Sequence, residues 1–272
     1  MTITLAEAAL AVLGTANAVA KAEASRQWAA AWRNGMLTEI GVGEPAARPA
    51  RPDHPPLRPP SEMPKRRKAG SLAGRVALLH ALAHIELNAV DLSWDVIARF
   101  SDPARAKVPL PRAFFDDWVA VADDEGRHFL ALAERLSCLG SHYGALPAHD
   151  GLWQSSVDTA HDLAARLAVV PMVLEARGLD VTPAMITSLR RHGDDPSADL
   201  LQIIHDDEIT HVAVGKRWFE HVCALQQREP ISTWQTLVTT YFRGVLKRPF
   251  NYRSREAAGF AAAYYDPIST GP

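Results

Sequence analysis

Two short segments of this sequence place a carboxylate and an imidazole one helical turn apart. Both have the pattern Asp-Glu-x-x-His, at residues 124–128 and 207–211. Positions i and i+3 lie on one face of an α-helix, so the glutamate and the histidine of each motif can reach the same ion. Carboxylate oxygens with one imidazole nitrogen per ion suit iron or manganese, whereas a zinc site usually takes more nitrogen or sulfur. The motifs therefore predict a transition-metal site. Its ligands would be Glu125, His128, Glu208 and His211.

Two single glutamates complete the pattern. Glu86 and Glu175 each lie in an apolar helical stretch, so a single Glu precedes each motif along the chain. Each is also followed five residues later by an aspartate, Asp91 or Asp180, which makes a weak internal repeat. Taken alone, either glutamate would more often be a surface residue paired with Lys or Arg. Together, four buried carboxylates and two imidazoles would be very unfavourable unless two divalent cations balanced the negative charge. We therefore expect a dinuclear centre with both glutamates as further ligands.

The aspartate that precedes each motif glutamate has its own role in this hypothesis. A metal-bound histidine commonly donates its other ring N–H to a carboxylate, which fixes the tautomer and orients the ring. Asp124 and Asp207 are the candidates for these two contacts.

The elements that must position these side chains are predicted to be helices almost throughout. Periodicity of 3.6 residues and weak strand signals indicate an all-α protein, in which four long helices form an antiparallel bundle. Pro171, one turn before Glu175, should kink its helix or force a local bulge. Thr182-Pro183 is expected to end one helix and start another. The expected helical ranges are 4–32, 71–99, 111–139, 155–178, 183–192, 197–227, 231–246 and 254–265.

The sequence also predicts four successive segments. They are an N-terminal helix (1–35), a Pro-rich basic linker (41–70), a di-metal four-helix bundle (71–227) and a C-terminal helical extension (228–272). Thr4 and Glu7 have the spacing of a capping box, and the stretch lacks the basic start of an export signal. Eight prolines between residues 45 and 64 predict an extended connector. Its charges, including the basic run 65–68, indicate a solvated linker, with anchoring to RNA or a partner as the alternative.

Composition excludes several other classes of protein. The 29 Lys+Arg and 31 Asp+Glu leave a net charge of −2, which argues against a general nucleic-acid binder. Two cysteines are too few for a disulfide scaffold, and no stretch approaches the roughly 20 apolar residues of a membrane span. We expect a cytoplasmic protein with no membrane contact; a homodimer remains open.

With the six ligand positions in place, residues 71–227 resemble the ferritin-like di-metal carboxylate superfamily, in which two helices give a Glu and two give Glu-x-x-His. Pro249-Phe250-Asn251 and Ala258-Gly259-Phe260 are similar to the C-terminal segment of a ferritin-like family of unknown function within it. The resemblance implies a ferritin-like four-helix bundle, with extra helices at both ends here, and two iron ions; Fe/Mn and Mn/Mn centres remain open.

Asp-Glu-x-Arg-His at 124–128 is similar to the motif of di-iron monooxygenases and acyl desaturases. This resemblance implies an O2-dependent oxidoreductase, an oxygenase or oxidase acting on an unidentified organic substrate. Basic residues in the linker and at 247–255 leave a modified tRNA base open. No dinucleotide fingerprint is present, so electrons would come from an external donor such as a ferredoxin or reductase. The alternatives are an iron-handling ferroxidase and a non-catalytic interaction module held together by the metals. Leu179 replaces the threonine of many bacterial di-iron monooxygenases, so hydroxylation does not follow from the resemblance.

Overall fold

The computed structural model describes residues 3–59, 62 and 70–271, and over this part of the chain the protein is mostly helical, as predicted. The α-helices are α1 (Leu5–Leu13), α2 (Ala18–Arg33), α3 (Leu72–Phe100), α4 (Pro103–Ala106), α5 (Arg112–Cys138), α6 (Gly151–Asp158), α7 (Leu163–Val169), α8 (Ala176–Arg191), α9 (Asp195–Leu225), α10 (Pro230–Tyr241), α11 (Tyr252–Ala257) and α12 (Ala262–Tyr265). A π-helix, η2 (Val170–Glu175), joins α7 to α8, and a short 3-10 helix, η3 (Asp266–Ile268), follows α12. Two short strands, β1 (Leu246–Lys247) and β2 (Ser269–Thr270), pair in parallel.

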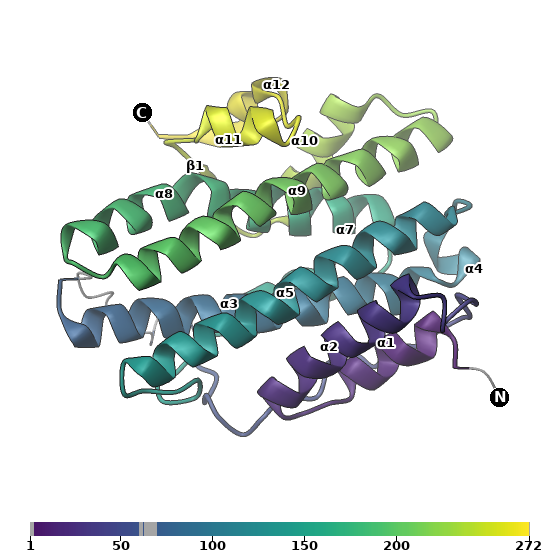
Figure 1. Cartoon of the computed structure of the whole chain (residues 1–272). Helices are drawn as coiled ribbons and strands as arrows, with labels where there is room; N and C mark the ends of the chain where they lie inside the picture. The colour runs from purple at the N-terminus through teal and green to yellow at the C-terminus, as the bar shows by residue number, and fades with distance from the viewer. Residues whose placement is uncertain (1–2, 60–61, 63–69, 272) are drawn as a thin grey trace.

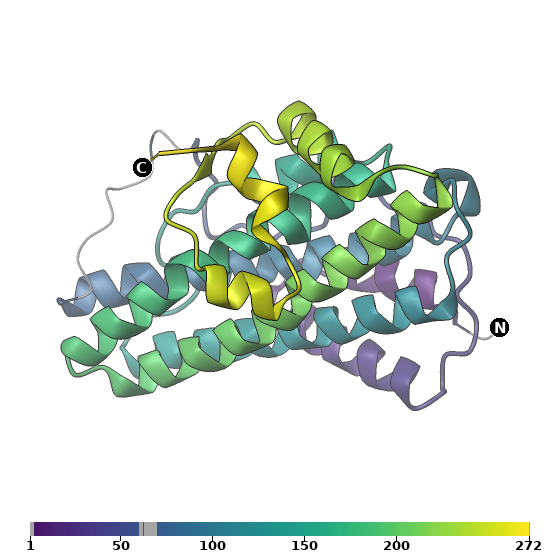
Figure 2. The ribbon, with the colours of Figure 1, turned by 90° about the horizontal axis from the view of Figure 1, so that it is seen from above.

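The long helices form two packed pairs. Helix α3 packs along α5, α8 packs along α9, and α5 and α9 connect the pairs (Figure 1). The remaining helices cover the outside, with α1 on α3, α2 on α5, and α10 on α7. Seen from above, α10, α11 and α12 lie over the α8 and α9 side of the molecule (Figure 2).

Among the described residues, two large apolar clusters and a small third one fill the interior, and a polar layer lies between the two large ones. On α5, Ala122, one turn before Glu125, belongs to the larger of these two, and Phe129, directly after His128, belongs to the smaller. On α9, Val212 and Ile204 divide in the same way. The larger cluster also takes in residues of α1, α2, α10 and the C-terminal segment, so the predicted terminal segments share its core.

Several helix boundaries differ from the sequence-based prediction. The region 4–32 contains two helices, because the chain breaks after Gly14 and α2 restarts at an Asn17 cap that accepts a hydrogen bond from Ala20 N at 2.9 Å. The Thr4–Glu7 capping box is confirmed. Near the C-terminus, α10 ends at Tyr241 instead of 246, and the predicted helix 254–265 is split into α11 and α12 by Gly259, whose φ is +69°.

The prediction of a new helix at Pro183 is wrong, and the prediction of a break at 178 fails with it. Helix α8 runs through Pro183 without interruption. A proline here leaves the carbonyl of Leu179 without its helical donor. The side chain of Asn251 donates to that carbonyl at 3.1 Å, so the C-terminal segment supplies the missing hydrogen bond. In the other direction, the predicted helix 155–178 is divided among α6, α7, η2 and the start of α8.

The bulge predicted at Pro171 is confirmed. Residues 170–175 form the π-helix η2, whose last residue is Glu175. Proline cannot donate the hydrogen bond that would keep this segment α-helical. Single-turn π segments are rare in proteins, and many of those that occur lie at functional sites. Gly215 on α9 makes room for the bulge, because a Cβ atom there would lie 2.3 Å from Cβ of Pro171.

The described part of the Pro-rich linker is extended, as predicted, but it is attached to the helices. Arg58 N donates to the carbonyl of Ala148 at 2.8 Å, and Ala148 N donates to Pro56 O at 3.1 Å. Arg51 forms an ion pair of 2.9 Å with the buried Asp91. The interpretation as a solvated linker is therefore wrong for Arg51, while the basic run 65–68 lies outside the described residues. Within the described residues no helix combines the length and apolar character that crossing a membrane requires.

Candidate metal centre

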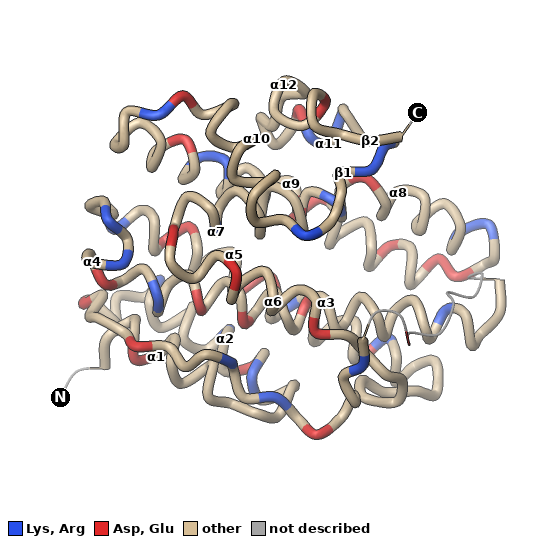
Figure 3. The backbone as a smooth tube through the Cα atoms, turned by 180° about the vertical axis from the view of Figure 1, so that it is seen from behind, with Lys and Arg blue, Asp and Glu red and all other residues tan. Residues whose placement is uncertain are grey.

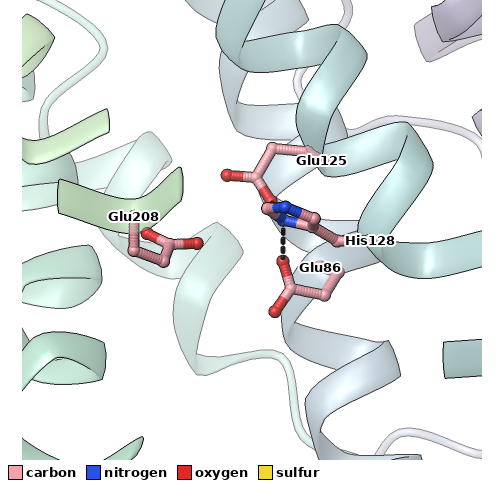
Figure 4. A group of neighbouring side chains, drawn as sticks. All are labelled: Glu86, Glu125, His128 and Glu208. Carbon is pink, nitrogen blue, oxygen red and sulfur yellow. Dashed lines mark ion pairs between the residues drawn. The ribbon is translucent and has the colours of Figure 1, made fainter. Parts of the chain in front are cut away.

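The predicted ligands come from four elements and meet in the polar layer. Glu86 comes from α3, Glu125 and His128 from α5, Glu175 from the end of η2, and Glu208 and His211 from α9. Four of them, Glu86, Glu125, His128 and Glu208, each offer one donor atom, and these atoms all lie within 4.8 Å of one another (Figure 4). This buried group could hold a metal ion.

Each imidazole presents its Nδ1 atom to the carboxylates. His128 Nδ1 lies 3.5 Å from Glu86 Oε2 and 3.5 Å from Glu125 Oε2. His211 Nδ1 lies 3.0 Å from Glu125 Oε1 and 3.6 Å from Glu208 Oε1. Glu125 therefore reaches both imidazoles with different oxygens, a position suited to a carboxylate between two ions.

Glu175 faces the same layer from the side of His211. Its Oε2 atom is buried without a hydrogen-bond partner. Burial raises the pKa of Glu175 well above its usual range, and the negative charges of Glu208 and Glu125 raise it further. The pKa of Glu86 is raised for the same reasons, burial first and then the charge of Glu125. A nearby cation would reverse both shifts by favouring the carboxylate form.

The unpartnered atoms provide the test of whether a metal fits. Buried polar groups almost always have a hydrogen-bond partner, and each orphan is unfavourable by about 1–3 kcal/mol. All six predicted ligands nevertheless have at least one buried atom without a partner, and these atoms belong to one layer. The atoms are Glu86 Oε2, both carboxylate oxygens of Glu125, His128 Nδ1, Glu175 Oε2, Glu208 Oε2 and His211 Nδ1. Oxygen and imidazole donors of this kind are those expected around iron or manganese.

The Nε2 atom of each histidine contacts the aspartate of the other motif. His128 Nε2 lies 3.0 Å from Asp207 Oδ2, and His211 Nε2 lies 3.4 Å from Asp124 Oδ2. In the neutral imidazole that a metal ion would bind, an Nε2–H that donates to a carboxylate leaves the Nδ1 lone pair free to face the layer. The hydrogen bond from His128 lowers the pKa of Asp207 to about 2. Both predicted aspartates thus contact a histidine, and the contacts cross between α5 and α9.

The pKa values of both histidines are also shifted by these surroundings. Burial lowers the pKa of His128, but its hydrogen bond with Asp207 and the nearby carboxylates of Glu125 and Glu86 outweigh burial and raise the pKa well above the usual range. For His211, the charge of Glu125 is the largest of the effects that overcome burial and raise its pKa.

Arg127 is a part of this arrangement that the sequence analysis included in the Asp-Glu-x-Arg-His motif but gave no role. Its Nη2 atom lies 2.6 Å from Asp124 Oδ1 and 2.9 Å from Asp207 Oδ2, so one guanidinium links both aspartates. The side chain is 37% exposed, which places it on the solvent side of the layer. Its position between Glu125 and His128 in the first motif was the available signal, because a residue one before the histidine can face the neighbouring helix.

The fold and the site together define an all-helical protein with a buried Glu and His group able to hold a metal ion. Residues 14–266 match the model of a protein family of unknown function, DUF455, and the chain belongs to that family. It is also 39% identical over 217 residues to an uncharacterized protein of Haemophilus influenzae, covering 80% of this chain and 75% of that protein. No solved structure matches.

Proposed function

We propose that this protein is an O2-dependent oxidoreductase with a dinuclear iron centre in a ferritin-like four-helix bundle. The bundle helices are α3, α5, α8 with its η2 extension, and α9. The observation that carries the proposal is the set of buried, unpartnered donor atoms on all six predicted ligands. When bound, the two ions would supply the reduction of O2 and the oxidation of an organic substrate.

The ligands form two similar halves. Glu86 and His128 would hold one ion, since Glu86 Oε2 and His128 Nδ1 lie 3.5 Å apart. Glu175 and His211 would hold the other, because they are the corresponding glutamate and histidine of the internal repeat. Glu125 and Glu208 lie between the halves and would bridge them. Four carboxylates balance two divalent cations, and manganese in one or both positions would satisfy the same donors.

The chain itself contributes orientation and exclusion of water. Asp124 and Asp207 hold the imidazoles, and the two apolar clusters lie on either side of the polar layer. The proposal requires an external electron donor such as a ferredoxin or reductase and an organic substrate of unidentified class. Two surface hollows of about 400 and 300 Å³ lie along the Pro-rich linker, and none of the six ligands lines either one.

Metal analysis and a single-turnover reaction test the proposal. We expect natively purified protein to contain two transition-metal ions per chain, and Glu125→Ala to contain fewer. Anaerobically reduced, iron-loaded protein mixed with O2 should give a transient visible absorption band, with iron retained afterwards. Retention separates this activity from that of a ferroxidase, which would release ferric ion.

Three results would overturn the proposal. Substantially fewer than two ions per chain would remove the dinuclear centre. Release of ferric ion would favour an iron-handling protein. Two bound ions with no reaction toward O2 would favour a metal-stapled interaction module.

A further inference from the structure

The repeated aspartates Asp91 and Asp180 have equivalent surroundings at opposite sides of the candidate centre. Each lies five residues after the single glutamate of its own helix, Glu86 or Glu175. Both carboxylates are fully buried. Each is paired with an arginine that comes from outside the four long helices.

On α3, the partners come from the N-terminal part of the chain. Lys21 on α2 lies 2.5 Å from Asp91 Oδ1, and Arg51 of the Pro-rich linker lies 2.9 Å from Asp91 Oδ2. Arg51 also donates to the side chain of Asn88 at 2.8 Å. Asn88 in turn donates to the carbonyl of His84 at 2.7 Å, so this network spans the turn of α3 that carries Glu86.

On α8, Arg177 of the same helix lies 3.4 Å from Asp180 Oδ2, and the closer partner comes from the C-terminal segment. Arg255 contacts Asp180 with two nitrogens, Nε at 2.9 Å and Nη2 at 2.8 Å. Its Nη2 atom also lies 3.4 Å from the carbonyl of Ala176, the residue directly after Glu175. Asn251 adds its backbone N–H to Asp180 at 2.9 Å. These contacts span the turn that follows the π-helix, where carbonyls lose their regular helical donors.

A gain in folding stability does not explain why these ion pairs are buried. Taking both charges of an ion pair out of water offsets most of their attraction, so replacing a buried pair by apolar residues is often neutral. A bidentate arginine does, however, fix geometry, because its planar group matches a carboxylate in one orientation. Arg255 holds Asp180 in this way. Arg51 instead joins two side chains of α3, because its Nη2 atom contacts both Asp91 and Asn88. These contacts beside two candidate ligands favour a role in positioning.

We propose that Arg51 with Asp91, and Arg255 with Asp180, are equivalent positioning pairs for Glu86 and Glu175. In this arrangement the two ends of the chain each fix one half of the centre: the linker sets the turn of α3, and the C-terminal segment sets the turn after η2. The expected effect of these pairs on metal binding rests on the proposed dinuclear centre. Their expected effect on the two helices does not depend on a bound metal.

Hydrogen exchange of metal-free protein tests the effect on the helices. Arg255→Lys keeps the charge but loses the bidentate contact, so backbone exchange should rise in residues 172–182 and stay unchanged in 82–92. Arg51→Lys should give the reverse. Arg48→Lys and Arg243→Lys are matched controls, because these arginines belong to the same two segments but pair at the surface with Asp150 and Asp158. Equal changes in both regions, or no change in either, would contradict the proposal.

Metal titration tests the effect on the centre. In a Glu86→Ala background, only the half of the candidate centre that contains Glu175 remains complete. There, Arg255→Lys should weaken Fe²⁺ binding about 10-fold, while Arg51→Lys should leave Fe²⁺ binding unchanged. In a Glu175→Ala background the two effects should exchange. Loss of affinity by both variants in both backgrounds would indicate general destabilisation and overturn the proposal. If wild-type protein binds no Fe²⁺, the proposed function fails and the exchange experiment alone decides on the positioning pairs.

Discussion

At the scale of single residues, the crossed aspartates make the two halves of the centre depend on each other. Asp207 belongs to the motif on α9 yet holds His128 of α5, and Asp124 does the reverse for His211. Arg127 then links both aspartates. A shift of α5 against α9 would therefore disturb both imidazoles at once.

This arrangement predicts the effect of Asp207→Asn. An amide accepts the hydrogen bond from His128 Nε2–H less strongly and can donate to that nitrogen instead, which would place the proton on Nδ1, the atom that faces the candidate ions. We expect metal affinity to fall by about 10- to 100-fold, measured by competition with a chelator of known affinity.

Asp206→Asn is the matched control, because Asp206 is the preceding residue on the same helix and its side chain is 63% exposed. Its metal affinity should equal that of the wild type. Unchanged affinity in Asp207→Asn would show that the contact with His128 does not tune the ligand.

The ligand residues could be predicted from sequence because their signal is local. Glu125 and His128 share a helical turn, and the two apolar stretches mark Glu86 and Glu175 as inward-facing. The partners Lys21 and Arg51 could not be predicted in this way. They lie 70 and 40 residues from Asp91, and only the packed arrangement of α2, the linker and α3 brings them together.

At the scale of elements, the π-helix η2 is the most specific local feature. Pro171 removes a backbone donor, and Gly215 on α9 leaves the space that the displaced backbone occupies. The sequence analysis could predict an irregularity at Pro171, because proline acts within its own helix. The uninterrupted helix at Pro183 could not be predicted, because the compensating donor is Asn251, a residue distant in sequence.

Gly215→Ala tests the close contact between α9 and η2. The new methyl group would lie 2.3 Å from Cβ of Pro171, far inside the contact distance of two non-bonded carbon atoms, so η2 must move. We expect the free energy of unfolding, from urea titration, to fall by about 1–3 kcal/mol. Metal affinity should fall as well, because Glu175 ends the displaced segment.

Gly178→Ala on α8 provides the opposite case. No atom lies within 4 Å of a Cβ built at Gly178, and alanine is the better helix former. This variant should raise the free energy of unfolding by roughly 0.5–1 kcal/mol. If Gly215→Ala were also neutral or stabilising, α9 and η2 would not be packed as closely as described.

At the scale of the whole molecule, segments outside the long helices complete the structure around the centre. Positions of Lys, Arg, Asp and Glu are spread along both the long helices and the segments that surround them (Figure 3). The all-α class could be predicted from periodicity alone. The division into separate terminal segments did not anticipate their shared core, because pairwise packing between distant segments leaves no periodic signal.

A further long-range contact joins α3 to the loop between α5 and α6. His80 Nε2 accepts a hydrogen bond from Gly144 N at 2.9 Å. His84 lies between Tyr143 Oη, 2.8 Å from its Nδ1, and the carbonyl of His149, 3.0 Å from its Nε2. These partners suit neutral imidazoles, and burial lowers the pKa of each histidine from 6.5 to about 4.

These lowered pKa values predict an acid-dependent loss of stability. Between about pH 6.5 and pH 4 the unfolded chain binds a proton at each histidine while the folded chain does not, so the free energy of unfolding must fall as the pH falls. The contribution is fully present above pH 6.5 and is lost toward pH 4, on the order of 3 kcal/mol per histidine. Urea titrations of metal-free protein at several pH values across this range measure how steeply the free energy of unfolding changes with pH.

Because the carboxylates and imidazoles of the candidate centre titrate too, the informative quantity is the difference in this slope between variants. His84→Gln should flatten the slope, since glutamine does not titrate. A slope equal to that of the wild type in His84→Gln would mean that this histidine is not held neutral in the folded protein.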